Sequence, residues 1–302
     1  MKYLVATFVL CAGFAVAASV AKKTGARSQP IEVGEVKWGR DFDAALAQSK
    51  KSRKPVLLLF QEVPGCTGCK KFGGDVLSHP LLVEAIEDEF VPMLVHNNRS
   101  QGADLEILKR YKEPAWNFQV IRFLDADGKD VIPRKDRVWT VSAVAGRMIE
   151  ALEASDREVP NYLRTLAPLG KTEQAAFAMH CFWTGEMEIG KIDGVVATEA
   201  GWLEGREVTL VDFQPGKVSL NELTKKAAAA GCAQKVYPEP GKRYRKAKSS
   251  DQAKQIQGTP VAKVPNLTAL QRTKLNSFWR TDRKRALEWL SPRQVATLKA
   301  QR

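Results

Sequence analysis

Two cysteines lie between a short apolar run and the start of a helix, and this order restricts the fold more than any other feature of the sequence. Residues 55–60 read Pro-Val-Leu-Leu-Leu-Phe, a continuous run that is typical of a strand buried on both faces. A helix is expected from about Thr67. Cys66 and Cys69 are therefore expected at a strand-to-helix turn.

This position determines the chemistry that the Cys-x-x-Cys motif can perform. Unpaired N–H groups and the macrodipole at a helix N-terminus favour thiolate, which lowers the pKa of Cys66. Cys69 faces the same side of the first turn, so it can close a disulfide after Cys66 has attacked a partner. We predict Cys66 as the nucleophile and Cys69 as the resolving thiol, with a static disulfide or a metal site as alternatives. A tetrahedral zinc site needs four ligands, and no second Cys-x-x-Cys or suitably spaced His pair is present, so no metal is predicted.

Residues 38–97 resemble exported thioredoxin-like proteins, because they contain KPVLLLF, the Cys-x-x-Cys motif, a helix and the apolar run 90–95. The VPGCTGC form resembles a branch of this family in which the first cysteine is sometimes selenocysteine. Residues 123–129 match the family's strand, Asp-Gly turn and strand. The resemblance implies a thioredoxin-like domain over residues 30–150.

The sequence departs from this family at one position opposite the cysteines. Thioredoxin-like proteins carry a cis-proline there, which shapes peptide binding and keeps metals off the thiols. Counting back from the strand at residue 123 places Gln119 at that position, whereas Pro114 lies five residues earlier. Either the loop 111–119 is rearranged so that Pro114 serves, or the residue has been lost.

A second cysteine also follows a predicted strand, residues 175–179. Cys181-Phe182-Trp183, the triplet 193–195 and the stretch 198–202 resemble, in order, the GCFWxxE, PGV and TxxGY blocks of peptide methionine sulfoxide reductase A. Residues 207–223 match a further segment of that family. The resemblance covers roughly 45 residues and implies a two-layer α/β domain over residues 172–237. The predicted fold class of the whole chain is therefore α/β (α+β).

The resemblance also implies roles for individual residues. Cys181 would attack the sulfur of methionine sulfoxide while a carboxylic acid protonates the oxygen. By the motif match that acid is Glu207, with Glu186 as the alternative. The sulfenic acid left on Cys181 would be resolved by Cys232 or by Cys66. The residues expected to hold the substrate are Phe182, Trp183 and Trp202.

Parts of the reductase pattern are absent from this chain. His180 stands where the family has glycine, and the long loop that carries its substrate-binding tyrosines is reduced to residues 203–206. The later GSQYRS segment is missing. A site without those hydrogen-bond donors would hold a sulfoxide poorly.

The two ends of the chain differ from the middle. Lys2 precedes the uncharged stretch 3–21, which predicts a cleaved secretory signal at residues 1–21 and a periplasmic or secreted protein, an uncleaved anchor being the alternative. The chain carries a formal charge of +13, and residues 241–302 alone account for that excess. We expect residues 238–302 to be a solvated basic linker and helical tail that contacts an anionic envelope surface and not nucleic acid.

Taken together, the motifs predict an exported thiol redox protein in which the thioredoxin-like domain supplies electrons to the reductase-like domain of the same chain. The expected partners are oxidised proteins or peptides and an upstream membrane thiol reductant. No cofactor is expected. The competing predictions are a thioredoxin-like oxidoreductase, or an envelope binding protein, whose reductase-like domain is inactive.

Overall fold

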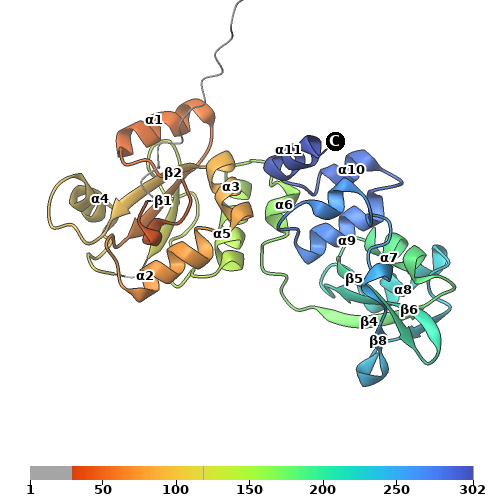
Figure 1. The fold of residues 1–302 in the computed structure, drawn as a ribbon. Coiled ribbons are helices and arrows are strands. Elements are labelled where there is room, and N and C mark those ends of the chain that lie inside the picture. Colours follow the sequence, from red (N-terminus) through yellow and green to blue (C-terminus); the bar gives the residue numbers. More distant parts are fainter. Residues whose placement is uncertain (1–28, 118, 302) are drawn as a thin grey trace, which may run out of the picture.

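The computed structural model describes residues 29–117 and 119–301. The predicted signal at residues 1–21 lies outside this part of the chain. Among the described residues, no helix is both long enough and apolar enough to span a bilayer. Figure 1 shows two lobes joined by a connecting segment, with the last helix of the chain between them.

The first lobe contains a three-stranded sheet in the order β2-β1-β3. Strand β1 (Val56–Gln61) pairs parallel with β2 (Val91–His96) and antiparallel with β3 (Val120–Leu124). All six residues of β1 are buried, as its apolar run predicts. The helices of this lobe are α1 (Phe42–Ser52), α2 (Thr67–Lys71), α3 (Pro80–Glu89), α4 (Ala103–Tyr111), α5 (Val141–Ala154) and α6 (Asn161–Arg164).

Both faces of this sheet are covered because alternate side chains of a strand point to opposite sides. Leu57 and Leu59 pack with apolar residues of α3 and α5. Leu58 and Phe60 pack on the other face with residues of α1 and α4. The helices therefore enclose β1, and its carboxyl end leads directly into the cysteine motif.

The second lobe contains an antiparallel five-stranded sheet in the order β7-β4-β6-β5-β8. Its core side chains pack with those of α7 (Phe182–Gly190) and α8 (Leu220–Ala229). Strand β6 pairs with the strand that precedes Cys181, and Ala178 lies opposite Val208. The strands are β4 (Glu173–Ala178), β5 (Val195–Leu203), β6 (Arg206–Phe213), β7 (Lys235–Tyr237) and β8 (Arg245–Lys246).

The basic C-terminal segment is folded, which corrects the expectation of a solvated linker and tail. Strand β8 joins the sheet beside β5, and apolar residues between 253 and 298 form a core of their own. Its helices are α9 (Ala269–Phe278), α10 (Arg283–Leu287) and α11 (Pro292–Ala300). The Lys274 ammonium is buried against the carbonyl groups of Gly190 and Ile192, at 2.7 and 3.0 Å. The net charge of the segment does not indicate this core, because its apolar residues are spread between positions 253 and 298.

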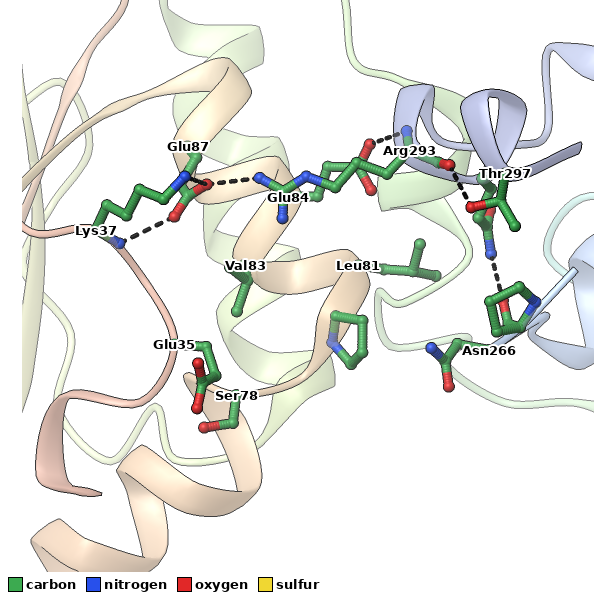
Figure 2. Close-up of a pocket in the computed structure, with 13 residues that line it drawn as sticks. Glu35, Lys37, Ser78, Leu81, Val83, Glu84, Glu87, Asn266, Arg293 and Thr297 are labelled. Carbon is green, nitrogen blue, oxygen red and sulfur yellow. Dashed lines mark hydrogen bonds and ion pairs between the residues drawn. The ribbon is translucent and has the colours of Figure 1, made fainter. Parts of the chain in front are cut away.

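The last helix also contacts the first lobe through two acidic residues of α3. The buried carboxylate of Glu84 accepts hydrogen bonds from Ser291 Oγ and from the Arg293 backbone N–H, both at 2.6 Å. Glu87 accepts from the Arg293 guanidinium at 2.5 Å and from the Lys37 backbone N–H at 2.9 Å (Figure 2). Carboxylates at a helix N-terminus satisfy free N–H groups and interact favourably with the helix dipole. Helix α11 therefore connects the two lobes.

Candidate functional site

The first candidate site lies where β1 ends and α2 begins. Cys66 is the N-cap residue of α2 and is exposed, whereas Cys69 lies within α2 and is buried. The two Sγ atoms are 3.6 Å apart and hydrogen-bonded, and both cysteines are free thiols. The structure therefore brings the two predicted thiols together at the predicted strand-to-helix turn.

The surroundings separate the pKa values of the two thiols. The pKa of Cys66 is lowered, first because the Cys69 backbone N–H donates to its sulfur and second because the Cys69 side chain does. Burial, together with the neighbouring Cys66 sulfur, raises the pKa of Cys69 to about 11. The expected effect of the helix macrodipole on Cys66 is limited to the N–H groups close to its sulfur, since α2 has only five residues. The exposed sulfur is therefore the one that ionises first.

Two buried polar residues hold this turn from behind. Glu32 accepts a hydrogen bond from the Gly65 backbone N–H at 3.0 Å. Gln61 Nε2 donates to the carbonyl groups of Glu32 and Cys69, at 2.7 and 3.1 Å. A Cβ at Gly65 would lie 2.5 Å from the Glu62 carbonyl oxygen, so the turn has no room for a side chain there. Sequence reasoning missed Glu32 and Gln61, because neither belongs to a local motif.

The neighbouring loops are tied to the same edge of the sheet. Asn98 donates from Nδ2 to the Pro64 carbonyl at 3.0 Å. The Asn97 carbonyl accepts from the Trp116 backbone N–H at 3.0 Å. The Trp116 side chain is 69% exposed, an unusual position for a large apolar group. It gives this edge an apolar contact surface that the sequence analysis did not predict.

The structure does not make Pro114 a cis-proline. Among the described residues, the cis peptide bond is Val63–Pro64, which precedes the cysteine motif. Pro114 is exposed on its loop. Gln119 is buried and immediately precedes β3, as the counting from the sequence predicts. The structure therefore does not show the rearrangement of loop 111–119 that would let Pro114 act as the cis-proline of the family.

The second candidate site surrounds Cys181, the N-cap residue of α7. Glu207 at the start of β6 accepts a hydrogen bond from the Phe182 backbone N–H at 2.9 Å, so its carboxylate lies beside the first turn of α7. The ring centroid of Phe182 is 6.0 Å from that of Trp183 and 5.6 Å from that of Trp202. The structure thus gathers a thiol, a carboxylate and three aromatic side chains.

Glu186, the alternative acid, is directed at the C-terminal segment instead. Its carboxylate is 1% exposed and accepts from the Ala253 backbone N–H at 3.0 and 3.2 Å. Burial raises the pKa of Glu186 to about 7. These contacts give it a structural role in attaching the segment that follows β8.

Cys232, one of the two thiols expected to resolve the sulfenic acid, is buried just after α8. Gly231 has φ +72°, and the Cys232 backbone N–H donates to the Ala227 carbonyl at 2.8 Å. This is the pattern of a Schellman motif, which buries the residue after the glycine against the last turn of α8. The Cys232 side chain is 1% exposed, and burial raises the pKa of its thiol.

One comparison with known proteins falls within the first lobe. Residues 37–126 match the family described as thioredoxin-like. A solved structure titled "DsbH Oxidoreductase" is 21% identical, over 44% of this chain and 95% of that chain, with a TM-score of 0.34. No curated protein matches the chain. The first lobe is thus a thioredoxin-like domain within a mixed α/β protein.

Proposed function

We propose that the thioredoxin-like domain is a thiol-disulfide oxidoreductase, with Cys66 as nucleophile and Cys69 as resolving thiol. The observation that carries this proposal is the 3.6 Å separation of the two sulfurs, one exposed and one buried. The lowered pKa of Cys66, from hydrogen bonds donated by Cys69, supports the same assignment.

The reaction follows thiol-disulfide exchange. The Cys66 thiolate attacks one sulfur of a substrate disulfide, which forms a mixed disulfide and releases the other substrate sulfur as a thiolate. Cys69 loses its proton and attacks the Cys66 sulfur, which releases the second substrate thiol and leaves a Cys66–Cys69 disulfide. Two electrons pass to the substrate. A thiol reductant, proposed here to be a membrane protein, returns the pair to its reduced form.

The substrates proposed for this site are oxidised proteins or peptides. Trp116 offers an exposed apolar side chain on a loop that is fixed to Asn97 at the end of β2. An aromatic side chain in this position can bury apolar substrate area on binding. On the basis of its first 21 residues, we place the protein in the periplasm or outside the cell, where disulfides persist.

A trapping experiment tests this assignment. Cys69→Ser should accumulate a mixed disulfide between Cys66 and a disulfide-bonded peptide, because the resolving step is removed, and intact-mass spectrometry would detect the adduct. Cys66→Ser should form none, and Cys232→Ser is the matched control that should behave as the unaltered protein. An adduct on Cys69 in the Cys66→Ser variant would reverse the two roles.

A second proposed activity is the reduction of methionine sulfoxide at Cys181. The Glu207 carboxylate beside the first turn of α7 favours it, together with the three aromatic rings there. The Cys181 sulfur would attack the sulfoxide sulfur, and Glu207 would protonate the oxygen. The products are methionine and a Cys181 sulfenic acid, which then condenses with Cys232 or Cys66 to give a disulfide and water.

Turnover of a methionine sulfoxide peptide with dithiothreitol tests this second activity. Cys181→Ser should abolish it, whereas Cys66→Ser should not, because dithiothreitol replaces the first domain as reductant. Full turnover by Cys181→Ser would remove Cys181 as the nucleophile.

A further inference from the structure

A third ligand-bearing side chain stands beside the two cysteines of the thioredoxin-like domain. Glu62 directly follows β1, four residues before Cys66. One carboxylate oxygen of Glu62 and the Sγ atoms of Cys66 and Cys69 all lie within 4.8 Å of one another. We propose that these three residues bind Zn²⁺, with the fourth coordination position open to water or to a ligand from a partner. This inference goes beyond the proposed function.

The separation of the sulfurs fits a tetrahedral ion. With Zn–S bonds of about 2.3 Å and a tetrahedral angle, two coordinating sulfurs stand about 3.8 Å apart. The observed separation is 3.6 Å. A linear two-coordinate ion with bonds of the same length would hold them about 4.6 Å apart. Both thiolates can therefore bind one tetrahedral cation with very little movement.

Charge supports the same conclusion. Within the described residues, the Glu62 carboxylate has no hydrogen-bond or ion-pair partner. With both thiols ionised, three anionic groups within this small radius would repel one another, whereas a divalent cation at their centre turns each interaction into an attraction. Carboxylate oxygen and thiolate sulfur are both established zinc donors.

The residues behind the turn supply the outer contacts that a metal site needs. Gln61 Nε2 donates to the Cys69 carbonyl at 3.1 Å, and Glu32 accepts from the Gly65 N–H at 3.0 Å. Such contacts orient the ligands and reduce the rearrangement that accompanies binding. The expectation from the sequence that no metal binds assumed four protein ligands, whereas zinc sites with three protein ligands keep an open position.

Binding of the cation and formation of the disulfide exclude each other, because both use the same two sulfur atoms. Zinc binding replaces the two thiol protons, which are released to solvent, and no electrons are transferred. The bound form would be protected from oxidation and unable to attack a substrate disulfide. Zinc would therefore hold the reduced pair in an inactive state.

Cobalt titration of the full reduced chain under anaerobic conditions tests the site directly. Co²⁺ replaces Zn²⁺ in tetrahedral sites, and its bonds to thiolate absorb in the near ultraviolet. We expect one equivalent to produce this band and Zn²⁺ to remove it. The band should be lost in Cys66→Ser and Cys69→Ser, and retained in Cys181→Ser and Cys232→Ser. No band, or an unchanged band in Cys66→Ser, would overturn the proposal.

Glu62→Gln tests the third ligand. It should keep the thiolate band but weaken the affinity for Co²⁺ at least about tenfold, whereas Glu106→Gln, an exposed acid on α4, should leave the affinity unchanged. Equal affinities of Glu62→Gln and the unaltered protein would remove Glu62 as a ligand. Circular dichroism confirms that each variant is folded. Disulfide exchange measured separately in the presence of a chelator keeps this test independent of the proposed oxidoreductase function.

Discussion

The two lobes place a cysteine in the same local position, at the N-cap of a helix that follows a buried strand, but they surround it differently. Cys66 has a second thiol 3.6 Å away. Cys181 has a carboxylate beside its helix instead, and Cys232 is buried at the end of α8. The first arrangement suits an exchange of disulfides without rearrangement. The second suits one chemical step at Cys181, and burial raises the pKa of the Cys232 thiol, which disfavours the thiolate that a resolving step needs.

The strongest test of this difference is the loss of each nucleophile in turn. Cys66→Ser should lower kcat/KM for reduction of a disulfide-bonded peptide at least about 10⁴-fold, because no other group replaces a missing nucleophile. Cys181→Ser should leave that rate unchanged. Steady-state kinetics with a coupled thiol reductant would measure both. Comparable losses in the two variants would mean that the lobes form one redox site.

The acid assigned to the second lobe provides the next test. Glu207→Gln should lower the turnover of a methionine sulfoxide peptide about 10³-fold, because an amide cannot protonate the leaving oxygen. The rate should not depend on Glu186 in the same way, since that carboxylate faces the Ala253 backbone. If Glu186→Gln causes the larger loss, the acid has been wrongly assigned.

Glu186 should instead affect stability, with a defined dependence on pH. Burial raises the pKa of its carboxyl from 4.5 to about 7, so between these values the folded state binds a proton that the unfolded state has released. This contribution to stability is complete below pH 4.5 and is lost as the pH rises to about 7.

Relative to Glu186→Gln, which cannot ionise, the unaltered protein should therefore lose about 2.5 kcal/mol of unfolding free energy between pH 5 and pH 8. Urea denaturation of both proteins at the two pH values measures the difference. Parallel pH profiles would show that the Glu186 carboxyl is not perturbed by burial.

The contact between α3 and α11 should have a smaller effect. Ser291→Ala removes a hydrogen bond to the buried Glu84 carboxylate and should cost about 2 kcal/mol. Hydrogen exchange should show faster exchange in residues 292–300, with Lys299→Ala, an exposed residue of the same helix, as the control. Unchanged protection of α11 would show that the helix is held by its apolar contacts alone.

How well the sequence predicts a feature of the structure depends on how far apart along the chain the contacting residues lie. Strand β1, the start of α2 and the position of Cys66 follow from neighbouring residues, so they were predicted. Glu32 and the attachment of Ser291 to Glu84 depend on residues 33 and 207 positions apart, for which the sequence offers no local signal. The burial of Cys232 did have a signal, because Gly231 after a helical run is typical of a Schellman motif.

The most direct test of the central claim, that the redox-active pair is in the thioredoxin-like domain, is a redox titration of Cys66, Cys69, Cys181 and Cys232 with residue-resolved mass spectrometry. The full chain would be equilibrated in glutathione buffers of increasing oxidation with a chelator present, then alkylated and digested. We predict that Cys66 and Cys69 are converted together to one disulfide, while Cys181 and Cys232 remain alkylated thiols. A Cys181–Cys232 disulfide that forms first, with Cys66 and Cys69 still reduced, would contradict the account.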